Sequence, residues 1–186
     1  MNKIIKWILI ISASFSNLVF GFTSPVVHIY FMGLIDPNFF SMVNFVEAGL
    51  SAVVNSILSI DEKRAKFKRY ALYFLALDSI AYIIIVALSI EHVYIRFFGL
   101  AIANSLLATV WFVMLNDSIN KKISGDTLTS FNTLQKSWML YASLIGAGIG
   151  SFFGNKIPIE VALWLQAVTS TIVAFCDGYT FKKLEE

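Results

Sequence analysis

Six stretches of mostly apolar residues, each close to the length that crosses a lipid bilayer, fill most of this chain. A spanning helix needs about 20 such residues. The stretches are Trp7–Ile35, Phe39–Ile60, Tyr70–Ile90, Val93–Leu115, Leu134–Gly154 and Pro158–Phe175. Only 14% of the 186 residues are charged, against roughly 25% in soluble domains, and the mean hydropathy is +0.74. We therefore predict an all-α membrane protein with six transmembrane helices in one domain, residues 1–186.

Three prolines and two lysines refine the helix boundaries. Pro37 and Pro158 lie where helices are expected to start, a position at which the missing N–H is harmless. Pro25 lies inside the first stretch and is expected to kink or break that helix. Lys3 and Lys6 precede an apolar run, as in a signal peptide, but the run is too long and shows no small-residue cleavage site. We expect a retained first helix.

Basic residues near the helix ends predict the orientation, because cytoplasmic loops are rich in Lys and Arg. Of the 14 basic residues, only Arg96 and Lys156 fall on the outer side. The cytoplasmic side would hold Lys3, Lys6, Lys63, Arg64, Lys66, Lys68, Arg69, Lys121, Lys122, Lys136, Lys182 and Lys183. Both termini are then cytoplasmic, in a multi-pass protein of the bacterial cytoplasmic (inner) membrane. The basic run 61–69 enforces this topology or, alternatively, binds anionic lipid.

Composition excludes several classes of function. One cysteine, Cys176, and two histidines provide neither a disulfide framework nor a metal-ligand cluster. A net charge of +2 is too small for a nucleic-acid binder. The chain has no nucleophile elbow, zinc-protease motif or phosphate-binding loop. We expect no catalytic residue, no metal and no cofactor, and the lipid bilayer is the expected surrounding.

Polar residues recur on one face of each of the first two helices. In the first helix these are Ser14, Asn17, Gly21, Ser24 and His28, and in the second they are Ser41, Asn44, Glu47, Ser51, Asn55 and Ser59. Spacings of three and four residues place each set on one helix face. A polar group in the hydrocarbon core needs protein or water beside it. The stripes indicate a cavity or an interface, and the alternative is helix packing through small polar residues.

Charged residues within the spans are further candidates. Glu47 and Arg96 fall at depths from which their side chains can meet, with His28 beside them, so we predict a charge pair or gate. The alternative for Arg96 is that its side chain extends to the outer headgroups. Asp78 lies near the middle of the third span and needs a partner or water.

The fifth span carries Gly146, Gly150 and Gly154 at intervals of four residues. Such a face lets another helix backbone approach closely. The spacing leaves open whether that helix belongs to the same chain or to a second copy.

The layout resembles the N-terminal six-helix half of a major facilitator superfamily transporter. Residues 16–30 look like the first helix of that family, residues 146–154 look like its glycine-rich fifth helix, and Arg96 to Gly99 is similar to the start of its fourth. Between the second and third spans, Asp61 and Lys66 fit the family's motif, whereas its glycines are absent.

The resemblance implies that the first and fourth helices line a central cavity, and that the second and fifth form the boundary between two halves. Solute would then contact Asn17, Ser24, His28 and Asn104. The boundary would contain Asn44, Ser51, Asn55, Gly146, Gly150 and Gly154. Since the chain has the length of one half, we expect a homodimer, or a pair with a second six-helix half, that transports a small solute by alternating access.

Two other functions remain open from the sequence. The chain has the size of the substrate-binding subunit of an energy-coupling-factor importer, although Ser12-Ala13-Ser14 is a poor version of the docking patch of those proteins. The other alternative is a non-transporting membrane protein, such as an immunity or regulatory factor or an inactive fragment. Neither alternative is excluded by the residues.

Overall fold

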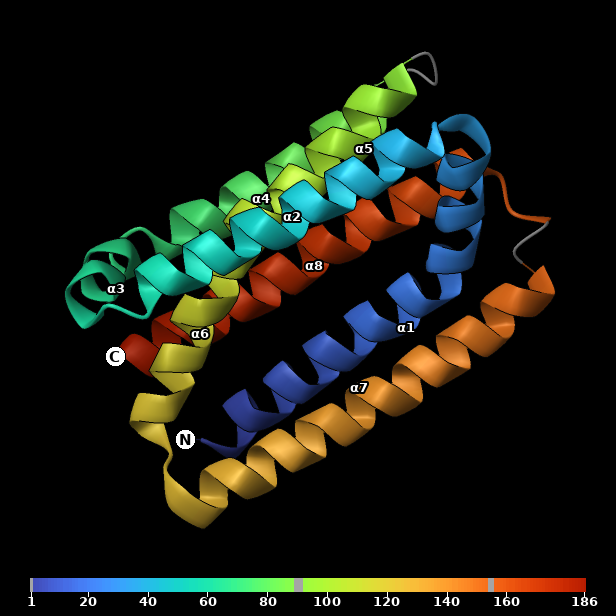
Figure 1. The fold of residues 1–186 in the computed structure, drawn as a ribbon. Helices are drawn as coiled ribbons and strands as arrows, with labels where there is room; N and C mark the ends of the chain where they lie inside the picture. Colours follow the sequence, from blue (N-terminus) through green and yellow to red (C-terminus); the bar gives the residue numbers. More distant parts are fainter. Residues whose placement is uncertain (1, 89–91, 154–155) are drawn as a thin grey trace. The chain divides into compact units, whose positions relative to one another are not determined.

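The computed structural model describes residues 2–88, 92–153 and 156–186, without the side chain of Asn104. The described residues are almost entirely helical and contain no strand, which confirms the all-α class. In chain order the helices are α1 (Lys3–Leu34), α2 (Pro37–Leu58), α3 (Asp61–Lys68), α4 (Ala71–Ala87), α5 (Val93–Ile102), the π-helix η2 (Ala103–Ala108), α6 (Thr109–Lys122), α7 (Gly125–Phe153) and α8 (Ile159–Glu185) (Figure 1).

Four of these helical segments are long and apolar enough to cross a membrane. They are α1, α2, α8 and the continuous segment Val93–Lys122 that contains α5, η2 and α6. The bent pair α3 and α4, with 67° between its helices, adds a fifth if it is one span. The 29 residues of α7 are long enough, but its first half carries Asp126 and Lys136. Six spans and the orientation therefore stay predictions.

Local sequence explains where α2 and α8 begin. Asp36 precedes α2, and its Oδ1 accepts hydrogen bonds from the backbone N–H groups of Asn38 (2.8 Å) and Phe39 (3.3 Å). Pro37 is the first residue of α2, and Pro158 directly precedes α8. These positions confirm the predicted helix starts. Pro25 lies inside α1, which stays helical from Lys3 to Leu34, so this proline does not break the helix.

The chain forms two compact units. The first contains Met1–Ile29 and Asp117–Glu186, and the second contains Tyr30–Asn116. α1 and α6 contribute residues to both units. The single domain predicted for 1–186 stays a prediction.

In the first unit, α1 and α7 lie side by side and run in the same direction (Figure 1). Glycine makes this contact close. A Cβ added at Gly21 would lie 2.7 Å from the carbonyl oxygen of Ser143 in α7. A Cβ at Gly146 would meet the Leu18 carbonyl in α1, and one at Gly150 would meet the Phe22 carbonyl. Any side chain at these positions would separate the two backbones.

In the second unit, α2 and α4 pack against the π-helix η2, and α5 continues directly into it. Aromatic side chains in the first half of α5 contact aromatic residues at the end of α1 and at the start of α2. The ring of Phe97 stacks on Phe40 at 4.9 Å and lies 5.2 Å from Phe31, while Phe39 meets Tyr94 edge-on at 4.9 Å. Aromatic pairs at such distances contribute beyond their buried area. They fix the start of α5 against α2.

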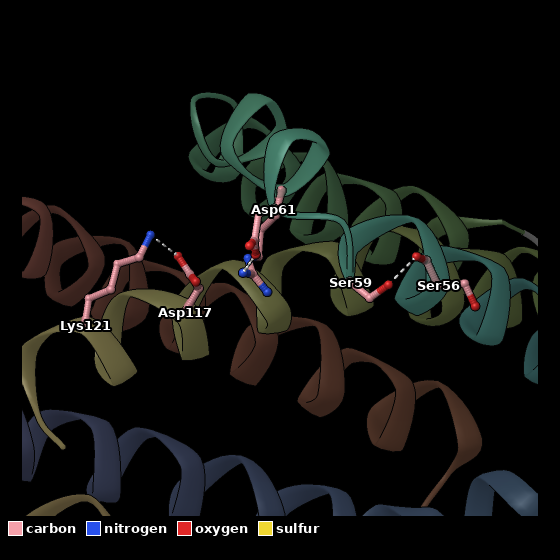
Figure 2. Close-up of polar contacts among 6 residues, drawn as sticks. Ser56, Ser59, Asp61, Asp117 and Lys121 are labelled. Atoms are coloured by element: carbon pink, nitrogen blue, oxygen red, sulfur yellow. Dashed lines mark hydrogen bonds and ion pairs between the residues drawn. The ribbon is translucent and has the colours of Figure 1, made fainter. Parts of the chain in front are cut away.

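All of α3 lies within the basic run 61–69, and its charges partly pair within the helix. Arg64 pairs with Asp61, and Lys66 Nζ lies 2.8 Å from Glu62 Oε1. The hydroxyl of Ser59, just before α3, donates to the Ser56 carbonyl at 2.7 Å (Figure 2).

A similar ion pair occurs in the first unit, where Lys121 Nζ lies 2.8 Å from Asp117 Oδ2 (Figure 2). The pair of Lys66 with Glu62 is exposed on both sides, and exposed pairs contribute little stability.

Candidate functional site

Asp78 is the carboxylic residue of α4. It lies in the middle of that helix, and its Oδ1 is buried without a hydrogen-bond partner in the described part of the chain. Asp78 shares α4 with Ser79, which is buried and whose hydroxyl donates to the Leu75 carbonyl at 3.2 Å. A buried carboxylate oxygen without a donor is unfavourable, and within a membrane it marks a functional group.

The helix segment packed against α4 has an unusual backbone. α4 contacts η2, which contains Asn104 and Ser105. Ser105 is buried, and its hydroxyl donates to the Ile102 carbonyl at 3.2 Å. π-helical turns within α-helices are rare and occur frequently at functional sites. Asn104 was predicted to contact the solute, but its side chain is not among those that the structure describes. Asp78 and the packed segment η2 form the candidate site of this unit.

Arg96 is buried rather than extended toward the outer headgroups. Only 2% of its surface is exposed, and its guanidinium Nη2 donates to the Val86 carbonyl at 2.9 Å and to the Leu88 carbonyl. These carbonyls lie at the C-terminal end of α4, where four C=O groups have no partner within the helix and the helix dipole favours a cation. Arg96 therefore caps α4 from α5.

The predicted charge pair of Glu47 with Arg96 is wrong in this structure. Glu47 is half-buried on α2 and has no hydrogen bond or ion pair with any residue in the described ranges. Arg96 instead donates to backbone carbonyls that the charge pattern could not reveal, because every helix end has them. His28, the third member of the predicted cluster, belongs to the first unit.

The polar stripe of α2 lies away from the core of its unit. Asn44 and Asn55 are exposed, and Ser51 and Glu47 are half-buried, whereas Val43, Val54 and Leu58 are buried. The stripe thus lies on the surface of the second unit, as a role at an interface requires. Its partner stays a prediction.

The residues of the polar stripe of α1 differ in their exposure. Ser24 and His28 are exposed, and Asn17 is half-buried with its amide donating to the Ala13 carbonyl at 2.9 Å. Neither of the two cavities described below contains Asn17, Ser24, His28 or Asn104 in its lining. The structure therefore does not gather the four predicted solute ligands around a described cavity.

Two contacts between α1 and α8 were not predicted. The Gln166 amide donates to the Thr23 hydroxyl at 2.8 Å, and both residues are buried. Nearer the chain termini, the Ser12 hydroxyl donates to Asp177 Oδ1 at 2.9 Å. Asp177 is half-buried. The sequence feature that could have predicted a contact of α8 is Gln166, an isolated amide in an apolar run.

The glycine face of α7 contacts α1 of the same chain. Gly146 and Gly150 are buried there, whereas Gly154 lies outside the described residues. The close contact predicted by the spacing is therefore intramolecular, and Gly146 and Gly150 are not residues of an interface between copies. Dimerisation itself stays a prediction.

Two apolar hollows lie in the first unit. One, of about 570 Å³, lies between α1 and α7. The other, of about 310 Å³, lies along α8 beside Trp164. The lining of the larger hollow contains no carboxylic or basic residue, and that of the smaller one contains only Glu160. Neither hollow is therefore lined by a group of charged side chains.

The chain was compared with protein-family models, with curated proteins and with solved structures, and none of the three comparisons gave a match.

Proposed function

We propose that the chain is a six-span protein of the bacterial cytoplasmic membrane that transports a small solute, with both termini in the cytoplasm. The observation that carries this proposal is Asp78, a carboxylate in the middle of α4 with a buried, unpartnered oxygen. Ionisable groups at this depth are costly and belong to solute or ion pathways. The π-helix packed on α4 supports the same site.

Asp78 would bind the solute or a coupling proton, and the irregular η2 segment would let α4 and α5 shift as the site changes access. The resemblance to one half of a major facilitator superfamily transporter supports alternating access. An exposed polar stripe on α2 supports a second copy or another six-helix half as partner, because lipid provides no hydrogen bonds to Asn44 and Asn55.

The test uses the purified chain in liposomes with an imposed proton gradient. Small cations, amino acids and sugars are added singly, and the internal pH is followed with a trapped dye. We expect one class of solute to collapse the proton gradient or to accumulate inside the liposomes. Asp78→Asn should abolish that signal while the far-UV circular dichroism spectrum stays unchanged. Glu62→Gln, which removes an exposed carboxylate from α3, serves as the control. Equal activity of Asp78→Asn and the original chain would refute the role of Asp78.

A further inference from the structure

The hollow between α1 and α7 is a groove on the N-terminal side of their glycine contact. Its exposed walls are Trp7, Ile11, Phe15, Trp138, Tyr141 and Ile145. Ser14 also lines it, but the Ser14 Oγ atom is buried and so is not presented to an occupant. An apolar chain suits these walls, whereas a polar solute would lose its hydrogen bonds.

The length of the groove matches one leaflet. Trp7 and Leu18, which mark its two ends on α1, are eleven residues apart. At a rise of about 1.5 Å per residue, this is roughly half of the hydrocarbon core, which is about 30 Å thick. Trp7 and Trp138 lie toward the same end, and tryptophan is enriched at the membrane interface. The groove therefore runs from one interface to the middle of the bilayer, where the glycine contact ends it.

Two lysines lie at the interfacial end. Lys3 and Lys6 precede Trp7 and Ile10 by four residues, so each shares a helix face with a groove residue. Neither ammonium group has a hydrogen bond or ion pair with a residue in the described ranges. In contrast, Lys66, Lys121 and Lys183 each pair with a carboxylate. The cationic charge at the groove mouth is unneutralised.

We propose that this groove binds one acyl chain of an anionic phospholipid, whose phosphate lies at Lys3 and Lys6. Charge at the mouth selects the headgroup, and the apolar walls between α1 and α7 hold the chain. The site rests on α1 and α7 crossing the bilayer, which is part of the proposed function, but it requires no transport activity.

The test measures quenching of tryptophan fluorescence by brominated lipid in nanodiscs. Trp111→Phe and Trp164→Phe leave Trp7 and Trp138 as the emitters. We expect the association constant of brominated phosphatidylglycerol to exceed that of brominated phosphatidylcholine by about fivefold for each lysine that contacts the headgroup. Lys3→Gln with Lys6→Gln should remove the preference. Lys122→Gln with Lys182→Gln removes the same charge from α6 and α8, and should preserve it.

A second variant tests the groove itself. Ala142→Leu places a larger side chain in the lining and should reduce quenching by both lipids without changing helicity. Equal quenching by the two lipids in the original chain would overturn the proposal, as would a preference that survives loss of both lysines. Absence of quenching, together with a disulfide between copies carrying Phe15→Cys, would show that a second copy fills the groove. A transport failure in liposomes leaves these readouts unaffected, so the two proposals fail separately.

Discussion

The Gln166 amide on α8 donates a 2.8 Å hydrogen bond to the Thr23 hydroxyl on α1, across 143 residues of sequence. Thr23 Oγ1 in turn donates to the Val19 carbonyl at 2.8 Å. Thr23 is 0% and Gln166 4% exposed, so neither polar group has access to solvent or lipid. The Thr23 oxygen thus accepts from Gln166 while its hydroxyl hydrogen is donated within α1, and this bond fixes the register of the first and last helices.

Thr23→Val should therefore destabilise the chain by leaving the Gln166 amide without its acceptor. Hydrogen bonds between membrane helices contribute about 0.6 kcal/mol on average and up to about 1.7 kcal/mol, and we expect the upper part of that range. Unfolding in mixed micelles measures the effect. Thr171→Val is the matched control, because the Thr171 hydroxyl donates only within α8, to Ala167. A loss as large for Thr171→Val would show that the contact between helices is not responsible.

Gly146→Leu should separate α1 from α7, because its Cβ would collide with the Leu18 backbone. Overpacking of this kind costs about 1–3 kcal/mol, and backbone contacts relax poorly. Gly148→Leu is the control, since an added Cβ at Gly148 meets no atom within 4 Å. Thermal unfolding in detergent should show a lower midpoint for Gly146→Leu alone. Similar midpoints for both variants would contradict the packing of α1 on α7.

Arg96→Met should weaken the end of α4, because the Val86 and Leu88 carbonyls lose their donor. Hydrogen bonds to charged groups contribute about 1.5–3 kcal/mol. Since Glu47 does not pair with Arg96, Glu47→Gln and Arg96→Met should be additive within about 0.5 kcal/mol in a double-mutant cycle. A larger coupling energy, measured by unfolding in micelles, would show that Glu47 and Arg96 interact after all.

The orientation predicts which introduced cysteines react from each side of the membrane. In a Cys176→Ser background, Lys156→Cys should react with an impermeant maleimide added outside intact cells. Lys63→Cys and Lys182→Cys should react only after the membrane is opened, because the basic residues are predicted to be cytoplasmic. External labelling of Lys63→Cys would reverse the topology.

Some functional contacts could be anticipated only in part. The intervals of Gly146 and Gly150 predicted a close helix neighbour, and α1 is that neighbour. The charges of Glu47 and Arg96 suggested a pair, but the carbonyls at the end of α4 receive the guanidinium. Backbone carbonyls exist in every helix, so a sequence pattern cannot single out these two. The π-helical turn at Ala103–Ala108 likewise has no distinctive residues.

The sequence by itself determined the all-helical class, the apolar segments and the helix starts at Pro37 and Pro158. Hydropathy, proline geometry and capping act over a few neighbouring residues, so they can be read locally. Tertiary structure alone decided that α7 meets α1, that Gln166 meets Thr23 and that Arg96 caps α4. Helical periodicity specifies which residues share a face. It does not specify what lies opposite, because that depends on how distant segments fill the space between them.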